Sequence, residues 1–403
     1  MNIPLKIGLV LNYKKAEKRK DELLSINSKT KPWLRKAQEK MYKKHIIISD
    51  KGAYTISVDV ALGVYLEYTY PNVIIDYITP DEISSKRFKQ NDIVFILIYD
   101  LLEAFHLSDK TKFYKYKQAL KTCKNVYPPY QYQKFINNKC IYYKYLFEKG
   151  IPVAPTYCIS KLKWFSKNPD TYVKNLLSKI KNKKWDSFIT KPVYGQEAIG
   201  FSKFLSCNNT VKKCKSEKCF KTKVSNNKST LDCQKTKIKK YLTKNLIKYK
   251  NIVVQKYING FDKKKPEIRT YYINGRYMYS IITTATVNTG MTEKTPIQEG
   301  GKYKIPDEEW NYIRLFSQKV MDTLPKLNLS GTMKHPLVTR IDIGSGLEGV
   351  PYTYFINEVE FVPSLFIYKT KTPVLETLAQ GLVEVGLVYA ELKQLNQLPV
   401  AII

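Results

Sequence analysis

Hydrophobic residues form three short, nearly unbroken runs in the first third of the chain. They span residues 6–12, 73–78 and 92–99. Such runs are typical of strands covered on both faces, so they predict a parallel sheet. A charged stretch separates the first two runs, and polar segments flank the third. This part of the chain therefore reads as alternating strands and helices of an α/β domain.

The middle of the chain shows a second, smaller α/β pattern. The expected elements are helices at 137–149 and 170–182 and strands at 156–160, 187–191, 200–205 and 252–257. Asn137 or Asn138 suits the N-cap of the first helix, and Gly150 lies just past its end. Residues 206–246 interrupt the unit and show almost no apolar periodicity. We expect them to form a flexible, Lys-rich insertion or a partly helical excursion.

The last third predicts hairpins and two long helices. Asn274-Gly275 lies between two alternating segments, which favours a two-residue hairpin turn. Helices are expected at 307–324 and 372–396.

A further hairpin, over residues 338–343 and 354–363, carries three acidic side chains. Glu358 and Glu360 are two residues apart, so both leave the same face of their strand. Asp342 can lie opposite them on the neighbouring strand. Three carboxylates on one face repel one another unless a cation lies among them, and all-oxygen ligands suit Mg²⁺. Since Mg²⁺ is commonly shared with substrate phosphates, the hairpin indicates a nucleotide-using enzyme.

Composition adds a strongly basic charge to this picture. The 403 residues carry a net charge of +33, and 43% of them are hydrophobic, as in a globular protein. Only seven of the 68 basic residues are Arg, and the excess of Lys, Tyr, Asn and Ile is typical of an AT-rich genome, viral or protist. We therefore expect solvated lysines rather than a specific nucleic-acid partner. Because lysine supplies nearly all of the positive charge, each arginine is a candidate for a site that needs two parallel hydrogen bonds to one carboxylate or phosphate.

The seven cysteines follow no regular framework, which favours a reducing compartment. Four cysteines cluster in the insertion without a CxxC spacing: Cys207, Cys214, Cys219 and Cys233. A zinc site and a set of free thiols are the two alternatives for this cluster. No signal peptide or run long enough to span a membrane is found. We expect a cytoplasmic protein, in a host cytoplasm or virion if viral, with no membrane partner.

Other catalytic classes find no support in the sequence. His45, His106 and His335 are far apart and form no triad or HExxH pattern. There is no GxSxG or catalytic Cys-His signature.

Several segments, in order, resemble the ATP-grasp superfamily over residues 125–370. Lys139, which precedes Gly150-Ile151-Pro152-Val153-Ala154-Pro155, resembles a lysine that contacts ATP phosphates in D-alanine–D-alanine ligases. Lys191 and the loop with Gly195 and Gly200 resemble the second lysine and the loop that covers the phosphates.

Two more segments extend the resemblance. Residues 253–260 resemble the adenine-binding linker, which implies that Gln255 and the backbone of Lys256 and Ile258 meet adenine. The remaining matches imply a ribose contact for Glu267, catalytic charge stabilisation for Arg269 and Arg340, and metal binding for Asp342, Glu358 and Glu360.

The chain departs from the superfamily pattern at two places. Many relatives have Glu-x-Asn where this chain has Glu358-Val359-Glu360, and Pro-Gly where it has Pro363-Ser364. The first departure adds a negative charge to the metal site, and the second changes a backbone position that holds substrate in some ligases.

The resemblance implies an ATP-grasp fold in three parts. These are an N-terminal Rossmann-like α/β domain (1–125), a central lobe with the insertion (126–258), and a C-terminal lobe with the metal site (259–403). The implied activity is that of a carboxylate–amine ligase, related to the D-alanine–D-alanine ligase and RimK-like groups. Such an enzyme would use ATP with Mg²⁺ or Mn²⁺ and form an acyl-phosphate intermediate.

Two alternatives stay open. One is an ATP-grasp kinase acting on a polyanionic alcohol, because Val126-Tyr127-Pro128-Pro129 loosely resembles the inositol trisphosphate 5/6-kinases. The other is a non-catalytic binding protein. The sequence identifies neither the small-molecule or peptide substrates nor the oligomeric state.

Overall fold

The structure of the chain is a computed structural model. It describes residues 4–11, 23–26, 31–48, 53–96, 105–106, 108–194, 200–205, 230–258, 267–283, 297–298, 305–329, 331–347, 353–363, 365, 367, 372–395 and 397.

The N-terminal part is built on a parallel sheet of order β5-β1-β6-β7. Its strands are β1 (Leu5–Val10), β5 (Val73–Ile78), β6 (Ile93–Ile96) and β7 (Val126–Tyr127). The helices here are α2 (Pro32–Arg35), α3 (Val58–Thr69), α4 (Ser85–Lys89) and α6 (Lys110–Thr122), with 3₁₀ turns η2 (Lys36–Gln38) and η3 (Lys40–His45). A small antiparallel sheet adds β2 (Leu23–Ser25), β4 (Tyr54–Ser57) and β3 (Ile47–Ile48). The predicted parallel sheet is confirmed.

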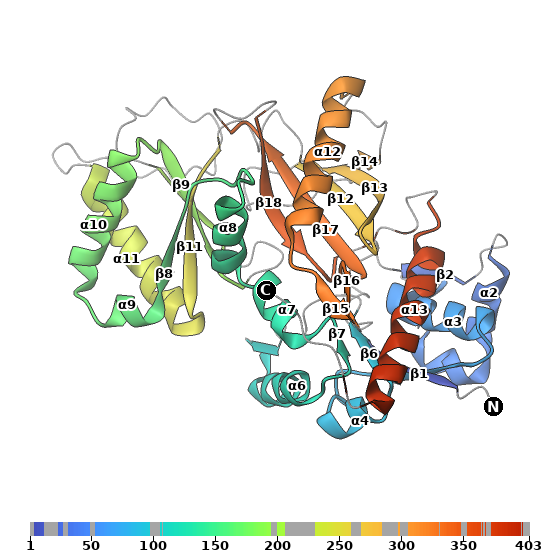
Figure 1. Ribbon diagram of the computed structural model, residues 1–403. Coiled ribbons are helices and arrows are strands. Elements are labelled where there is room, and N and C mark those ends of the chain that lie inside the picture. Colours follow the sequence, from blue (N-terminus) through green and yellow to red (C-terminus); the bar gives the residue numbers. More distant parts are fainter. Residues whose placement is uncertain are drawn as a thin grey trace.

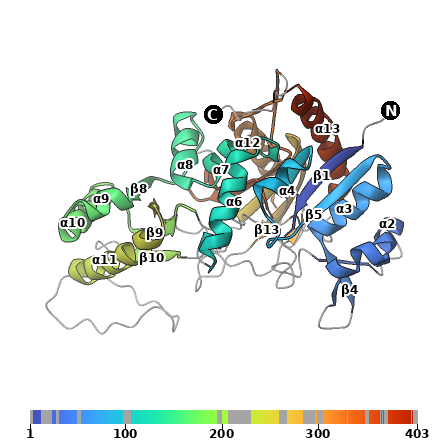
Figure 2. The same ribbon diagram turned by 90° about the horizontal axis from the view of Figure 1, so that it is seen from below.

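The last helix of the chain packs on this first sheet. Figures 1 and 2 both show α13 (Val374–Gln394) beside β1 and α3. Gly386 on α13 faces Leu5 and Ile93, where an added Cβ would lie 3.0 Å from Leu5 Cδ2. Lys393 Nζ lies 3.1 Å from Asp92 Oδ1. The predicted helix at 372–396 therefore forms, and it packs on strands β1 and β6, which lie more than 270 residues earlier in the sequence.

The central lobe is an antiparallel sheet covered by helices. Its strand order is β10-β9-β11-β8, with β8 (Thr156–Ser160), β9 (Ser187–Pro192), β10 (Ser202–Leu205) and β11 (Asn251–Lys256). The covering helices are α9 (Lys161–Phe165), α10 (Pro169–Asn182) and α11 (Thr230–Lys248). Asn168 caps α10 by accepting from the N–H groups of Asp170 and Thr171. These elements surround a separate hydrophobic core.

Helix α11 matches one of the two expectations for the insertion. Residues 206–229 lie outside the described residues, but residues 230–248 form a regular helix, as in the partly helical alternative rather than the flexible one. Ile238, Leu242 and Leu246 recur every four residues on one face and are fully buried in the central-lobe core. The lysines between them fill the other face and obscure this periodicity in the sequence.

The C-terminal lobe is a five-stranded antiparallel sheet of order β14-β13-β12-β17-β18. Its strands are β12 (Glu267–Ile273), β13 (Arg276–Thr283), β14 (Ile297–Gln298), β17 (Val338–Ser345) and β18 (Tyr354–Glu360). Helix α12 (Asp307–Thr323) and the pair β15 (Leu327–Leu329) and β16 (Thr332–Lys334) complete it. Asn274 and Gly275 both have positive φ, 53° and 77°, as the predicted hairpin turn requires.

Helix α8 (Lys139–Glu148) follows α7 (Tyr130–Ile136) and lies between the central-lobe sheet and β18 (Figure 1). The Asn138 side chain accepts from the N–H groups of Cys140 and Ile141 and caps it. After Gly150, the chain crosses to β18, where Pro152 O accepts from Ile356 N at 2.9 Å. The predicted helix, its cap and its end are confirmed.

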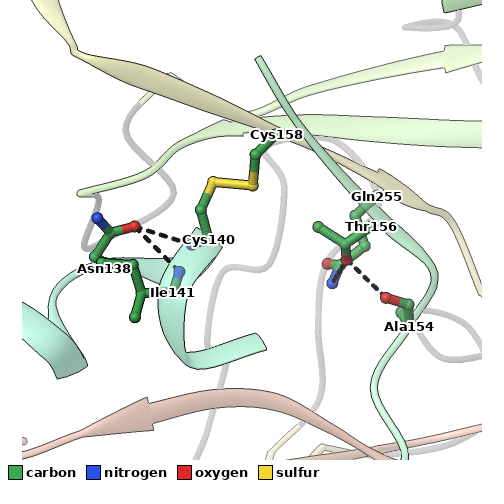
Figure 3. Close-up of a disulfide and its surroundings, with 7 residues drawn as sticks. All are labelled: Asn138, Cys140, Ile141, Ala154, Thr156, Cys158 and Gln255. Carbon is green, nitrogen blue, oxygen red and sulfur yellow. Dashed lines mark hydrogen bonds between the residues drawn. A yellow bond between two sulfur atoms is a disulfide. The ribbon is translucent and has the colours of Figure 1, made fainter. Parts of the chain in front are cut away.

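A disulfide joins α8 to strand β8. Cys140 on α8 pairs with Cys158 on β8, with their Cα atoms 6.0 Å apart (Figure 3). The sequence-based expectation of reduced thiols is wrong for this pair, because the turn after α8 brings two cysteines with no motif into bonding distance. Of the cysteine cluster in the insertion, only Cys233 belongs to the described residues.

Candidate active site

Three carboxylates meet on the C-terminal sheet as the hairpin pattern predicts. Asp342 on β17 pairs directly with Glu358 on β18, and Glu360 follows on the same face. Asp342, Glu358 and Glu360 each offer an oxygen within 4.8 Å of the others. Asp342 is buried, and Glu358 and Glu360 are partly exposed. This all-oxygen donor set fits a hard divalent cation such as Mg²⁺.

Arg340 binds two of these carboxylates. Its Nε and Nη2 donate to the two oxygens of Asp342 at 2.7 and 2.8 Å, and its Nη2 lies 2.9 Å from Glu360 Oε1. The bidentate geometry matches the role expected for an arginine in a lysine-rich chain. Burial opposes ionisation of Asp342, but Arg340 and Arg269 outweigh it and hold the Asp342 pKa below its usual value.

Arg269 and Glu267 extend the charged network onto β12. Arg269 is the cross-strand partner of Asp342, and its Nε lies 3.1 Å from Glu267 Oε1 and 3.9 Å from Asp342 Oδ2. Burial raises the pKa of Glu267 to about 8, although Arg269 opposes this shift. Burial likewise raises the pKa of Glu360 to about 7, with Arg340 opposing. The site therefore alternates acidic and basic side chains across three strands.

Two lysines reach this network from other elements. Lys139, the first residue of α8, places its Nζ 2.7 Å from Glu358 Oε1. Lys191 lies on β9 of the central lobe, and burial lowers its pKa to about 8, while Glu358 opposes the shift. The structure thus brings both predicted lysines to the carboxylate cluster, one from α8 and one from β9.

The residues expected to meet adenine lie at the end of β11. Gln255 is buried, and its Nε2 donates to Thr156 Oγ1 at 3.0 Å (Figure 3). Lys256 N donates to Pro155 O at 2.8 Å. Ile258 is buried with Ala154 and Phe355. These contacts place the predicted segment between β8 and β18, and the adenine role itself stays a prediction.

The loop after β9 is described only at its ends. Gly200 has φ +74°, and an added Cβ would lie 2.8 Å from Pro192 Cγ, so this position requires glycine. Gly195 and Ser364 lie outside the described residues.

Tyr143 is a site residue that sequence reasoning missed. Its hydroxyl accepts from Lys191 Nζ at 2.9 Å and donates to the Asn357 carbonyl. It lies four residues after Lys139 on α8, so both side chains lie on one helix face. That spacing from Lys139 is the signal that could have identified it.

Comparisons with known proteins address the fold. No protein-family model matches the sequence, and no curated protein matches it. Solved structures do match. D-cycloserine synthetase DcsG has a TM-score of 0.58 at 12% identity, with 94% of this chain and 99% of that chain covered.

Two further matches are bacterial ligases. D-alanine–D-alanine ligase from Bacillus anthracis has a TM-score of 0.52, and D-alanyl-alanine synthetase A from Vibrio cholerae has 0.53. Each is 12% identical and covers 96% of this chain and 99% of its own. Another structure of the B. anthracis enzyme, with a TM-score of 0.51, is complexed with ATP. The likeness extends over nearly the whole chain, and we conclude that this protein has the α/β ATP-grasp fold.

Proposed function

We propose that the protein is an ATP- and Mg²⁺-dependent carboxylate–amine ligase. One observation carries this proposal. Asp342, Glu358 and Glu360 form an all-oxygen cluster, and a lysine from α8 and another from β9 converge on it. Such an arrangement suits a triphosphate whose charge is neutralised by a metal on one side and by ammonium groups on the other.

The proposed metal site comprises Asp342, Glu358 and Glu360. Bound there, Mg²⁺ or Mn²⁺ would neutralise the charge on the ATP phosphates. Lys139 and Lys191 would hold the phosphates, and Arg269 and Arg340 would stabilise the charge that develops on the acyl group. Gln255, Lys256, Ile258 and Glu267 are proposed to bind the nucleoside, with Gly195 and Gly200 in the loop over the phosphates.

The proposed reaction has two steps. An oxygen of the substrate carboxylate attacks the γ-phosphorus, and the bond from that phosphorus to the β-phosphate oxygen breaks to release ADP. The amine nitrogen then attacks the acyl carbon, inorganic phosphate leaves, and the nitrogen loses a proton to give the amide. Positioning and charge stabilisation suffice for both steps, so no protein nucleophile is required.

A screen for ADP release tests this function. The protein is incubated with Mg-ATP and a pool of carboxylates and polyanionic alcohols, with and without a pool of amines. We expect ADP release that requires both pools and an amide product identified by mass spectrometry. Asp342→Asn is the inactive reference. A phosphorylated alcohol made without any amine would overturn the ligase proposal in favour of a kinase. A protein that Mg-ATP does not stabilise, and that Asp342→Asn leaves unchanged, would instead be a non-catalytic relative.

A further inference from the structure

We propose that Tyr143 is a positioning residue that fixes Lys191 against strand β18, so that the phosphate-binding lysine and the metal-binding strand keep one relative geometry. The inference rests on the proposed function, because it takes Lys191 as a ligand of ATP phosphate. It assigns Tyr143 no contact with the substrate itself.

The contacts of Tyr143 join three elements. Its hydroxyl accepts from Lys191 Nζ of β9 and donates to the Asn357 carbonyl of β18, while its backbone belongs to α8. Lys191 Nζ also lies 5.3 Å from the centre of the Tyr143 ring. The ring is buried against Tyr142, with a centroid separation of 4.6 Å. A rigid, buried phenol therefore connects the central lobe to the C-terminal lobe.

A β-bulge makes the Asn357 carbonyl available to Tyr143. In the pairing of β17 with β18, Asp342 faces Glu358 and Ile343 faces Ile356, so the register skips Asn357. A residue left out of the ladder has backbone groups that need other partners. Asn357 immediately precedes the metal-site residue Glu358, so the Tyr143 hydroxyl holds the strand directly beside the metal cluster.

The protonation state of the pair suits this role. Burial raises the pKa of the Tyr143 phenol above its ordinary value, so the hydroxyl keeps the proton that it donates to Asn357. Its oxygen is then free to accept from Lys191. Lysine has a long, flexible side chain, and holding it in one place before the phosphate arrives lowers the entropy lost on binding.

Tyr143→Phe tests the inference because it removes the hydroxyl and keeps the ring. We expect the affinity for Mg-ATP, measured by calorimetry, to fall by about tenfold, as for the loss of one charge-assisted hydrogen bond. Tyr132→Phe is the matched control. Tyr132 is also a fully buried tyrosine, and its hydroxyl has no hydrogen-bond partner within the described part of the chain. We expect its affinity for Mg-ATP to be unchanged.

A double-mutant cycle separates positioning from a general structural effect. In a Lys191→Met background, Tyr143→Phe should weaken Mg-ATP binding no further, because the lysine that it positions is gone. Equal losses in both backgrounds would overturn the inference, as would unchanged affinity in Tyr143→Phe alone. Wild-type protein that binds no Mg-ATP would overturn the proposed function, and this inference with it. Binding by the wild type with no coupling in the cycle would overturn the inference alone.

Discussion

Lys139 Nζ lies 2.7 Å from Glu358 Oε1, so a proposed phosphate ligand and a proposed metal ligand are paired with each other. The Lys139 side chain is 8% exposed and that of Glu358 is 22% exposed, so the pair is largely shielded from water. A divalent cation bound as proposed would compete with this lysine for the same carboxylate. The ion pair would therefore couple the proposed metal site to the proposed nucleotide site.

Replacing Lys139 should change metal and nucleotide binding in opposite directions. In Lys139→Met, Glu358 loses its competing cation, so Mn²⁺ should bind the nucleotide-free protein about tenfold more tightly, equivalent to ~1.4 kcal/mol. Mg-ATP should bind more weakly, because one phosphate ligand is lost. Mn²⁺ titration by electron paramagnetic resonance and calorimetry with Mg-ATP measure the two affinities.

The control is Lys144→Met, on the same helix, where the lysine is exposed and pairs with Glu148 at 3.6 Å. It should change neither affinity. Weakening of both affinities in Lys139→Met would contradict the competition between lysine and cation.

The buried carboxyl of Glu267 should make folding stability depend on pH. Its pKa is raised from 4.5 to about 8 by burial. Between these values the folded protein holds a proton that the unfolded chain releases, so the free energy of unfolding falls as pH rises. Burial raises the pKa of Glu360 to about 7, so this group also lowers the free energy of unfolding as the pH rises to about 7. Urea denaturation of the metal-free protein across this window should show the decline.

Glu267→Gln should reduce this slope, because the amide does not titrate. Glu148→Gln, an exposed glutamate on α8, is the control and should keep the wild-type slope. Equal slopes in Glu267→Gln and the wild type would refute the assigned shift, because buried His45, whose pKa is lowered to about 4, contributes the opposite slope in both proteins.

The sequence predicted the elements whose signals are local. The alternation around Asp342 and Glu358 and the Asn274-Gly275 turn each depend on neighbours in the chain, and the structure has both hairpins. The bulge at Asn357 could not be predicted in this way. The alternation that places Glu358 and Glu360 on one face is the same with or without it, and the Asn357 carbonyl finds its partner on a distant helix.

Contacts between distant segments account for the other omissions. Cys140 and Cys158 have no motif spacing, and they meet only because α8 and β8 run side by side after the turn at Gly150. The spacing of Tyr143 from Lys139 places it on the same helix face, but its hydrogen bond to Lys191 depends on β9, which is distant in the sequence.

The disulfide should stabilise the fold and hold α8 in place. A loop of 18 residues corresponds to about 3 kcal/mol by the chain-entropy estimate. The double variant Cys140→Ser/Cys158→Ser should lose stability by about this amount in urea denaturation. Dithiothreitol should destabilise the wild type to the same level and leave the double variant unchanged. A reductant that affects both proteins equally would show that the bond contributes nothing.

Helix α11 should be essential to the central lobe despite its lysine-rich sequence. Leu242 is fully buried in that core, so Leu242→Ala should lower the free energy of unfolding by about 2–5 kcal/mol. Ile247 on the same helix is 61% exposed, and Ile247→Ala should cost less than about 0.5 kcal/mol. Urea denaturation followed by tryptophan fluorescence reports on this core, because Trp164 and Trp185 both belong to it. Equal, small effects of the two substitutions would mean that α11 does not pack on the central-lobe core. The insertion would then be flexible, as in the other expectation from the sequence.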